Sequence, residues 1–213
     1  APAKTSDENG AKSLYGNKRV ELLSYVQKSV TKKSANSTPL DEALTGSLAA
    51  FRKIVNSPTL DWYFQKFHEP PELFHHCGRV AYTLAMFLYF RKVAPESEID
   101  NIVYSALIHE LECTLAENLK TVVSQQSLAH LEKNKHVVPR EVLQYLEIHD
   151  ELCSGKGFPN NRKRNEIPIV VRAFTLFNHF DAYRARNAGT RRARFDKTKE
   201  MMTARQADYD SGL

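Results

Sequence analysis

The sequence predicts an all-α fold, and three observations carry that prediction. Apolar residues recur at helical spacing in nearly every periodic segment of the 213 residues. Alternating strand patterns and internal repeats are absent from the sequence. Several periodic segments begin at a proline, which the first turn of a helix tolerates because the amide hydrogen that proline lacks would have no helical partner there. Together these features predict a bundle of helices without a sheet.

The first part of the chain is expected to form four helical segments. Their predicted ranges are Lys18–Thr31, Pro39–Val55, Leu60–Phe67 and Glu72–Lys92. A polar stretch separates the first two, and Pro39 suits the first turn of the second. Asn56-Ser57-Pro58 interrupts the chain before the third segment, and Pro95 closes the fourth.

The second part of the chain is expected to add four more helices. They begin at Ser97, Leu115, Pro139 and Pro168. Ser97 with Asp100 resembles a capped helix start. The helix from Pro139 is expected to end near Cys153, and the helix from Pro168 is predicted to be the last long one.

Composition fits one domain of generous size with a small extension. With 42% hydrophobic and 26% charged residues, the chain can bury a core and keep a polar surface. We expect a flexible leader over residues 1–12, an N-terminal helical segment over residues 13–67, and the main domain over residues 68–213. Membrane insertion is not expected, because no apolar run is long enough to cross a bilayer. Three widely spaced cysteines and no signal-peptide pattern indicate a cytoplasmic location without disulfides.

The whole chain has a net charge of +5. Two groups of basic residues lie in its C-terminal third. One basic group spans residues 162–164, and a second spans residues 184–194. These groups form either a solvated surface or a phosphate-binding surface. Aromatic residues do not alternate regularly with the arginines, so neither DNA nor RNA is an expected partner.

Histidines and carboxylates form pairs on three of the predicted helices. Glu72 and His76 are four residues apart and share a helix face, whereas His109-Glu110 and His149-Asp150 follow apolar runs. Imidazole and carboxylate groups are common ligands of divalent cations. The candidate metal ligands are Glu72, His76, His109, Glu110, His149, Asp150 and Asn178. The alternative is a structural pocket in which the same side chains bind one another and water without an ion.

A glycine-rich turn follows the third of these pairs. It reads Ser154-Gly155-Lys156-Gly157-Phe158-Pro159. Two glycines and a proline favour a tight turn whose backbone could approach an anion. The candidate phosphate contacts are Lys156, Arg172, Arg191 and Arg192.

From about Glu72 to Tyr209 the sequence resembles a divergent HD-GYP domain, the bacterial cyclic di-GMP phosphodiesterase branch of the HD superfamily. Four family motifs occur in order, at residues 72–81, 106–110, 149–159 and 167–182. The resemblance implies an HD-domain helical bundle with an N-terminal helical extension. It also implies a pocket that holds two or three metal ions, commonly iron or manganese, which activate water for attack on a phosphodiester.

The departures from the family pattern fall on its chemistry. Three ligand positions are altered, at Glu110, Asp150 and Asn178. Cys113 occupies the place of a phosphate-binding lysine, residues 123–127 lack an expected histidine, and Phe158 replaces the family tyrosine. Because a two-metal site depends on ligand number, charge and geometry together, the resemblance implies weak or absent hydrolysis.

The leading interpretation is a degenerate HD-GYP domain that serves as a regulatory or protein-interaction module in bacterial cyclic di-GMP-linked signalling. The expected cofactor is either none or a single weakly bound iron or manganese ion. The expected partner is another signalling protein or a second copy of the chain. Two alternatives remain open: an active metal-dependent cyclic di-GMP phosphodiesterase with substituted ligands, and a receptor that binds cyclic di-GMP without cleaving it.

Overall fold

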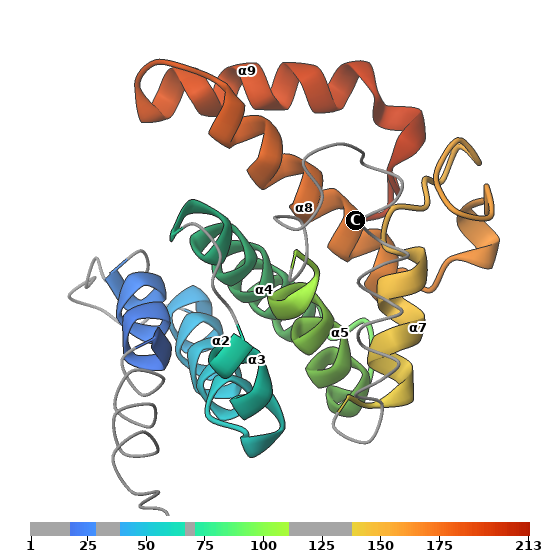
Figure 1. Cartoon of the computed structure of the whole chain (residues 1–213). Coiled ribbons are helices and arrows are strands. Elements are labelled where there is room, and N and C mark those ends of the chain that lie inside the picture. The colour runs from blue at the N-terminus through green and yellow to red at the C-terminus, as the bar shows by residue number, and fades with distance from the viewer. Residues whose placement is uncertain (1–17, 29–38, 67–70, 111–137) are drawn as a thin grey trace, which may run out of the picture.

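The all-α prediction is confirmed in the part of the chain that the structure describes. The computed structural model describes residues 18–28, 39–66, 71–110 and 138–213 (Figure 1). Within these ranges the chain forms helices and turns, and its only extended pairing is an isolated bridge between Ser154 and Lys163. The structure is therefore a helical bundle, as the apolar spacing indicates.

The helices lie close to the ranges expected from the sequence. After a helix at residues 18–28, the long elements are α2 (Pro39–Val55), α3 (Asp61–Lys66), α4 (Pro71–Arg91), α5 (Glu96–Ile108), α7 (Arg140–Ile148), α8 (Ile169–Arg186) and α9 (Arg191–Ala204). Three short 3-10 helices join them, η1 (Pro58–Leu60), η2 (Arg164–Glu166) and η3 (Gln206–Asp208).

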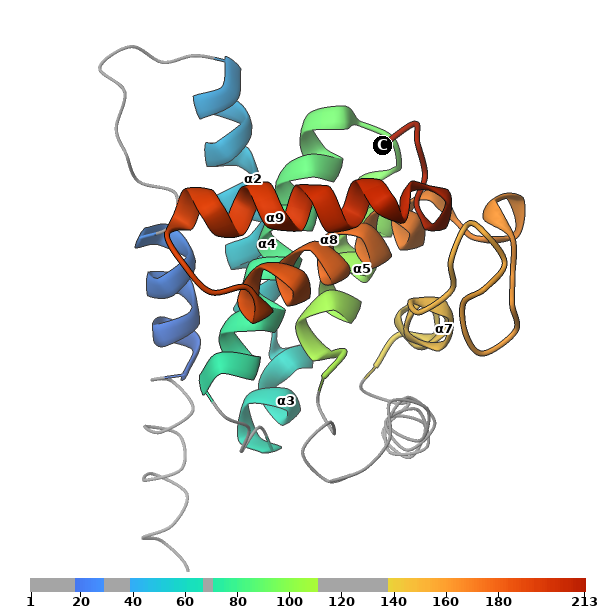
Figure 2. The same cartoon turned by 90° about the horizontal axis from the view of Figure 1, so that it is seen from above.

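Helix α4 is at the centre of the bundle. It contacts α2, α5 and α8, and α5 in turn contacts α7 and α8. Helix α8 also contacts α9, which lies on the outside of the bundle along α8 (Figures 1 and 2). This arrangement brings the C-terminal ends of α5 and α7 beside the N-terminal half of α4 and beside α8, where the candidate ligands occur.

One continuous hydrophobic core joins the N-terminal helices to the rest of the chain. Leu22 from residues 18–28 and Phe51 from α2 belong to the same buried cluster as Leu84, Leu107 and Phe174. Burial of such side chains stabilises the fold by about 1.5–3 kcal/mol each. The boundary at residue 67 stays a prediction, and the buried residues on its two sides share this core.

Prolines mark three helix starts. Pro95, Pro139 and Pro168 are the N-caps of α5, α7 and α8, each with an extended backbone and no side-chain capping bond. The predicted capped start at Ser97 is therefore wrong, because α5 already begins at Glu96. Asp100 instead accepts a hydrogen bond from Oη of Tyr89 at 2.9 Å.

The sequence prediction is also wrong at one helix boundary, and it misses one helix. Helix α7 ends at Ile148 and not near Cys153. The chain folds back there, and the amide of Phe158 donates to the carbonyl of Asp150 at 3.2 Å, so the helix cannot continue. Helix α9 follows α8, although the sequence predicts α8 as the last long helix. Its N-cap is Thr190, whose hydroxyl accepts a hydrogen bond from the amide of Ala193.

Some expectations fall outside the described residues. They are the leader at residues 1–12, the helix at residues 115–133, Cys113, and the missing histidine at residues 123–127. Among the described helices, none combines the length and the apolar character that a bilayer crossing requires.

Candidate functional site

Three histidines from three helices meet in one buried pocket. His76 lies in α4, and His109 and His149 are the residues directly after α5 and α7. The ring centroids of His76 and His109 are 5.3 Å apart, and those of His109 and His149 are 5.8 Å apart. Phe174 of α8 contacts His109 edge-on and stacks on His149 at an interplanar angle of 17°. The helix ends and this aromatic wall therefore fix the histidine rings.

Each histidine has an acceptor on its Nδ1 atom. Nδ1 of His109 donates to the carbonyl of Ala106 at 2.8 Å, and Nδ1 of His149 donates to the carbonyl of Leu146 at 2.6 Å. Nδ1 of His76 donates to Oδ2 of Asp181 at 2.8 Å. A carbonyl or an ionised carboxylate can only accept, so Nδ1 carries the hydrogen in all three rings. This is the arrangement that orients metal-binding histidines through Nε2.

His109 is the most secluded of the three. Burial, followed by the neighbouring His76 and His149, lowers the pKa of His109 well below its ordinary value, so its ring is neutral near pH 7. Its Nε2 atom is buried and has no hydrogen-bond partner among the described residues. A neutral imidazole with a buried lone pair is in the protonation state that metal binding requires.

Asp181 of α8 is saturated by the groups around it. Besides His76, its carboxylate accepts hydrogen bonds from Arg79 at 2.7–3.1 Å and from Arg184 at 2.8 Å. Burial alone would raise the pKa of Asp181, but the hydrogen bonds from His76 and Arg79 and the charge of Arg79 lower it far below its ordinary value. Arg79 also donates to Oη of Tyr25 at 2.8 Å, which connects the pocket to the N-terminal helix. Asp181 therefore orients His76 and is not available as a ligand.

The carboxylates of Glu110 and Asp150 lie farther from their histidine nitrogens than the carboxylate of Asp181 lies from His76. Oε1 of Glu110 is 3.6 Å from Nε2 of His109, and Oδ1 of Asp150 is 3.7 Å from Nε2 of His149. An ion bound tetrahedrally by one imidazole and one carboxylate separates the two ligand atoms by about 3.4 Å, because each lies roughly 2.0–2.2 Å from the ion. Both separations suit a shared cation, whereas the 2.8 Å contact between His76 and Asp181 leaves no room for one.

His76, His109 and Glu110 form the group that best suits a metal ion. One ligand atom from each lies within 4.8 Å of the other two. Nε2 of His76 also lies 3.0 Å from Oδ1 of Asn178, an amide oxygen that can only accept, so an ion at this nitrogen has to displace both that contact and the hydrogen that Nε2 donates to it. Glu72 is exposed in the first turn of α4 and is not in this group.

The residues just after the predicted glycine-rich turn bind a carboxylate of the chain itself. The carboxylate of Glu151, which is 1% exposed, accepts hydrogen bonds from the amides of Asn160 at 2.6 Å and Arg162 at 2.8 Å. A Cβ atom at Gly157 would lie 2.2 Å from the amide nitrogen of Leu152, so this position requires glycine. The amides of Asn160 and Arg162 are thus used inside the fold, and the turn holds the chain beside His149.

The candidate phosphate contacts are spread over the surface. Arg172, near the start of α8, forms an ion pair with Asp210, and Arg164 binds the same carboxylate at 2.5 Å. Lys156 is exposed in the turn. Arg191 and Arg192 are exposed at the start of α9, beyond the far end of α8, roughly 20 Å of helix away from Arg172. These side chains do not form one phosphate site.

Sequence reasoning misses the residues that hold the pocket together. Asp181 is not among the candidate ligands, and the histidine that it binds, His76, is 105 residues away. Glu151 directly follows the His-Asp pair, and asking where the amides of the next turn find acceptors could have identified it. His179 of α8 lies outside this network, and its Nδ1 atom contacts Oη of Tyr209 at 3.0 Å. Burial lowers the pKa of His179 below its ordinary value.

Comparisons with known proteins do not add a family. No protein-family model matches the chain, and neither the curated proteins nor the solved structures contain a significant match. The class of protein that the structure itself supports is a helical bundle with a buried pocket of three histidines. The likeness to HD-GYP domains rests on the four sequence motifs.

Proposed function

We propose that this chain is a degenerate HD-GYP-like domain whose histidine pocket binds a single divalent metal ion. Its role is that of a regulatory, protein-binding module in bacterial cyclic di-GMP-linked signalling, with weak or absent phosphodiesterase activity. The observation that carries the metal site is Nε2 of His109, which is buried without a hydrogen-bond partner in the described part of the chain and lies 3.6 Å from Glu110. Leaving such an atom unsatisfied costs free energy, and a bound cation satisfies it.

The ligand count favours one ion over two. In the described residues, the one group with three mutually close ligand atoms is His76, His109 and Glu110. Two-metal hydrolysis needs a second set of ligands that clamps the attacking and leaving oxygens. Asp181 cannot join that set without leaving its arginines, and Asn178 offers a neutral oxygen that binds divalent cations less well than a carboxylate does.

The donor set indicates the kind of metal. Two imidazoles with one carboxylate suit borderline divalent cations such as zinc, iron and manganese. The family resemblance favours iron or manganese among these. When bound, the ion would supply positive charge and Lewis acidity inside the pocket. The residues of the chain would hold it through Nε2 of the histidines, with Asp181 fixing the orientation of His76.

A regulatory role is supported by what the chain keeps and what it changes. Gly155 has a φ of +76°, Gly157 has no room for a side chain, and buried Glu151 holds the amides of the turn. These residues shape the backbone and match the family pattern. The positions that depart from the pattern include three metal-ligand positions, Glu110, Asp150 and Asn178. A kept fold with altered chemistry favours binding to another signalling protein or to a second copy over catalysis. The ion pair of Arg172 with Asp210 counts against a cyclic dinucleotide receptor that uses Arg172.

Metal binding is tested on the purified full chain. We expect at most one manganese or iron ion per chain by elemental analysis, and a single-site calorimetric titration with Mn²⁺. His109→Ala should abolish the binding, whereas Glu72→Ala, an exposed candidate ligand on α4, should leave it unchanged. Binding that survives His109→Ala, or no binding of manganese, iron or zinc to the unmodified chain, would remove the metal part of the proposal.

Catalysis is tested separately with the metal-loaded chain. We expect little or no hydrolysis of cyclic di-GMP in excess Mn²⁺ or Fe²⁺. Steady turnover that disappears in His109→Ala would contradict the regulatory assignment and favour an active phosphodiesterase. Tight binding of cyclic di-GMP without turnover would favour the receptor instead.

A further inference from the structure

Helix α9 covers α8 but does not fill the space beneath it. Of its residues only Thr198 is buried, and Phe195 is 45% exposed although its ring contacts that of Phe180. Two side-chain contacts hold the helix: Asn187, before its first residue, donates to Thr198 near its middle, and Arg205, just after its last residue, donates to Oη of Tyr183. A helix that is fixed in this way and packed poorly along its length leaves an apolar space against α8.

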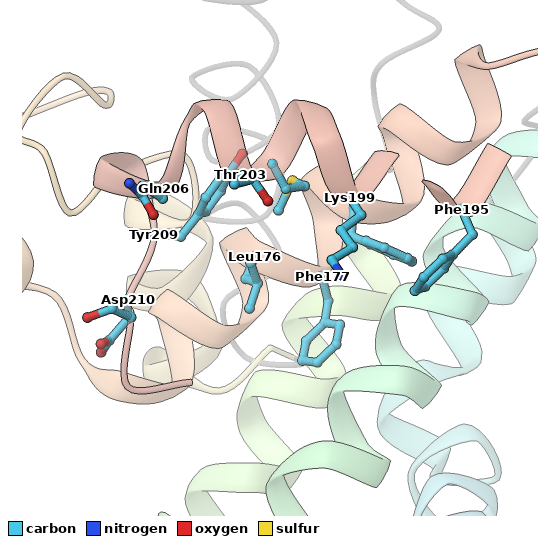
Figure 3. Close-up of a pocket in the computed structure, with 11 residues that line it drawn as sticks. Leu176, Phe177, Phe195, Lys199, Thr203, Gln206, Tyr209 and Asp210 are labelled. Carbon is cyan, nitrogen blue, oxygen red and sulfur yellow. The ribbon is translucent and has the colours of Figure 1, made fainter. Parts of the chain in front are cut away.

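That space is a cavity of about 390 Å³ (Figure 3). Its apolar lining comes from both helices and from the segment after α9. The main contributors are Leu176, Phe177, Phe180, Phe195, Met202 and Tyr209. Small-molecule sites typically enclose about 300–1,000 Å³ and combine apolar walls with a few polar groups. The cavity therefore has the size and the lining of a small-molecule site, and it is separate from the metal ligands.

A lysine enters this apolar cavity. Lys199 extends from α9 into the space between α9 and α8 (Figure 3). In the described part of the chain, Lys199 has no ion pair, whereas Asp210 at the other end of the cavity is neutralised by Arg164 and Arg172. Helix α9 carries five basic and two acidic side chains, so its surroundings are positive. Both features favour an anionic ligand group beside Lys199.

We propose that the cavity between α8 and α9 binds a free, single-chain anionic amphiphile, with its apolar chain against Phe177, Phe180 and Phe195 and its carboxylate at Lys199. The cavity volume suits a small molecule better than a docked helix, and this binding requires no metal. The positive charge of α9 discriminates between head groups of opposite sign, and the aromatic walls supply apolar contact area.

The test uses the three methionines of the chain as reporters. In the full chain with ¹³C-labelled methionine methyl groups, Met202 lines the cavity, whereas Met86 lies in α4. Titration with dodecanoate below its micelle concentration, in the presence of EDTA, should shift the Met202 signal in a saturable manner and leave Met86 unchanged. Dodecyltrimethylammonium, with the same chain length and the opposite charge, should bind at least about 10-fold more weakly.

Two matched variants assign the head-group contact. Lys199→Gln should weaken dodecanoate binding by about 10-fold, and Lys197→Gln, an exposed α9 lysine outside the cavity lining, should not. Phe195→Ser, at a position exposed enough to keep the fold, should also weaken binding. Equal binding of the cationic probe, or equal losses in both lysine variants, would overturn the proposal. The absence of a Met202 shift would also overturn it. This face would then be a surface for a lipid bilayer or for a partner protein. Sedimentation of the chain with phosphatidylglycerol vesicles would identify a bilayer surface.

Discussion

Two carboxylates approach the histidine pocket, and they are held in different ways. Asp181 accepts hydrogen bonds from His76, Arg79 and Arg184, all at 2.7–3.1 Å. Oε1 of Glu110 is 3.6 Å from Nε2 of His109, which is beyond hydrogen-bond distance. The first arrangement is complete without a ligand, and the second has the separation that a shared cation produces.

The difference indicates that one carboxylate of the pocket stabilises the fold and the other is available to bind a metal ion. A saturated buried carboxylate stabilises the fold because each partner depends on it, and removing it leaves charged groups without compensation. A carboxylate 3.6 Å from a buried imidazole makes no hydrogen bond to it, and an ion can lie between the two. Substitutions of the first kind should therefore change stability, and substitutions of the second kind should change metal affinity.

The largest effect is expected for Asp181→Asn. The variant leaves Arg79 and Arg184 without their buried carboxylate, so the free energy of unfolding at pH 7 should fall by about 3–5 kcal/mol. Urea denaturation measures this loss. The control is Asp196→Asn, which removes an exposed ion pair with Arg192 on α9 and should change stability by no more than about 0.5 kcal/mol. Equal losses in the two variants would show that the buried Asp181 stabilises the fold no more than an exposed aspartate does.

The same carboxylate predicts a pH dependence. Its folded-state pKa is lower than the unfolded value of about 3.9, so its stabilisation is complete above that pH and is lost as the pH falls toward the folded pKa. The difference in stability between the unmodified chain and Asp181→Asn should therefore shrink between pH 7 and pH 3. Denaturant titrations at both pH values test this, and a constant difference would contradict it.

The next largest effect is expected for Glu151→Gln. This side chain is engaged within the fold in the same way as Asp181, because the amides of Asn160 and Arg162, just after the glycine-rich turn, donate to its buried carboxylate. Losing the charged acceptor should lower the free energy of unfolding by about 1–3 kcal/mol. Glu147→Gln, at an exposed position of α7, is the matched control and should have almost no effect. A loss confined to Glu147→Gln would reverse our assignment.

Glu110→Gln should show the opposite behaviour. Its free energy of unfolding should fall by less than that of Asp181→Asn, because Glu110 is not a hydrogen-bonded partner of the histidine beside it. Its affinity for Mn²⁺ should fall at least about 10-fold, since even partners outside the coordination shell change metal affinity by roughly 10–100-fold. Calorimetric titration beside urea denaturation separates the two readouts. A strongly destabilised Glu110→Gln with unchanged metal binding would make the two carboxylates alike.

The smallest effect is expected when the site is restored. Asn178→Asp combined with Glu110→Asp should raise metal stoichiometry and tighten Mn²⁺ binding by up to about 10-fold, because a carboxylate replaces a neutral oxygen beside His76. Elemental analysis and calorimetry measure the change. If neither the double variant nor the unmodified chain binds metal, the pocket is structural, and the function has to be sought on the surface.

Local sequence features predict most of the fold. Pro39, Pro139 and Pro168 mark helix starts correctly because proline fixes the backbone angle without any tertiary contact. The end of α7 is missed because the fold-back of Phe158 onto Asp150 is a tertiary event. Helix α9 is missed because its apolar positions are few and form no clear stripe, as expected of a helix that buries only Thr198.

The candidate site is predictable as a set of histidines but not as a network. His76, His109 and His149 stand out because each follows or lies within an apolar helix and has a carboxylate near it in sequence. The partner of His76 is far away in the chain, and no local pattern indicates it. Arg172 is predicted as a phosphate contact and instead binds Asp210, since the sequence alone does not show which anion reaches an arginine first.

The segment around Asp208 has a consequence for the order of folding. The amide of Cys153 donates to the carbonyl of Asp208 at 2.9 Å, and Oγ of Ser154 donates to its carboxylate at 2.6 Å, across 54 residues of sequence. Contacts of such long range form late, because the intervening chain has to be ordered first. During synthesis, the turn beside His149 therefore acquires these bonds only after residues 208–210 have left the ribosome. A nascent chain that ends before these residues would contain all three histidines but would lack the hydrogen bonds that hold the turn beside His149.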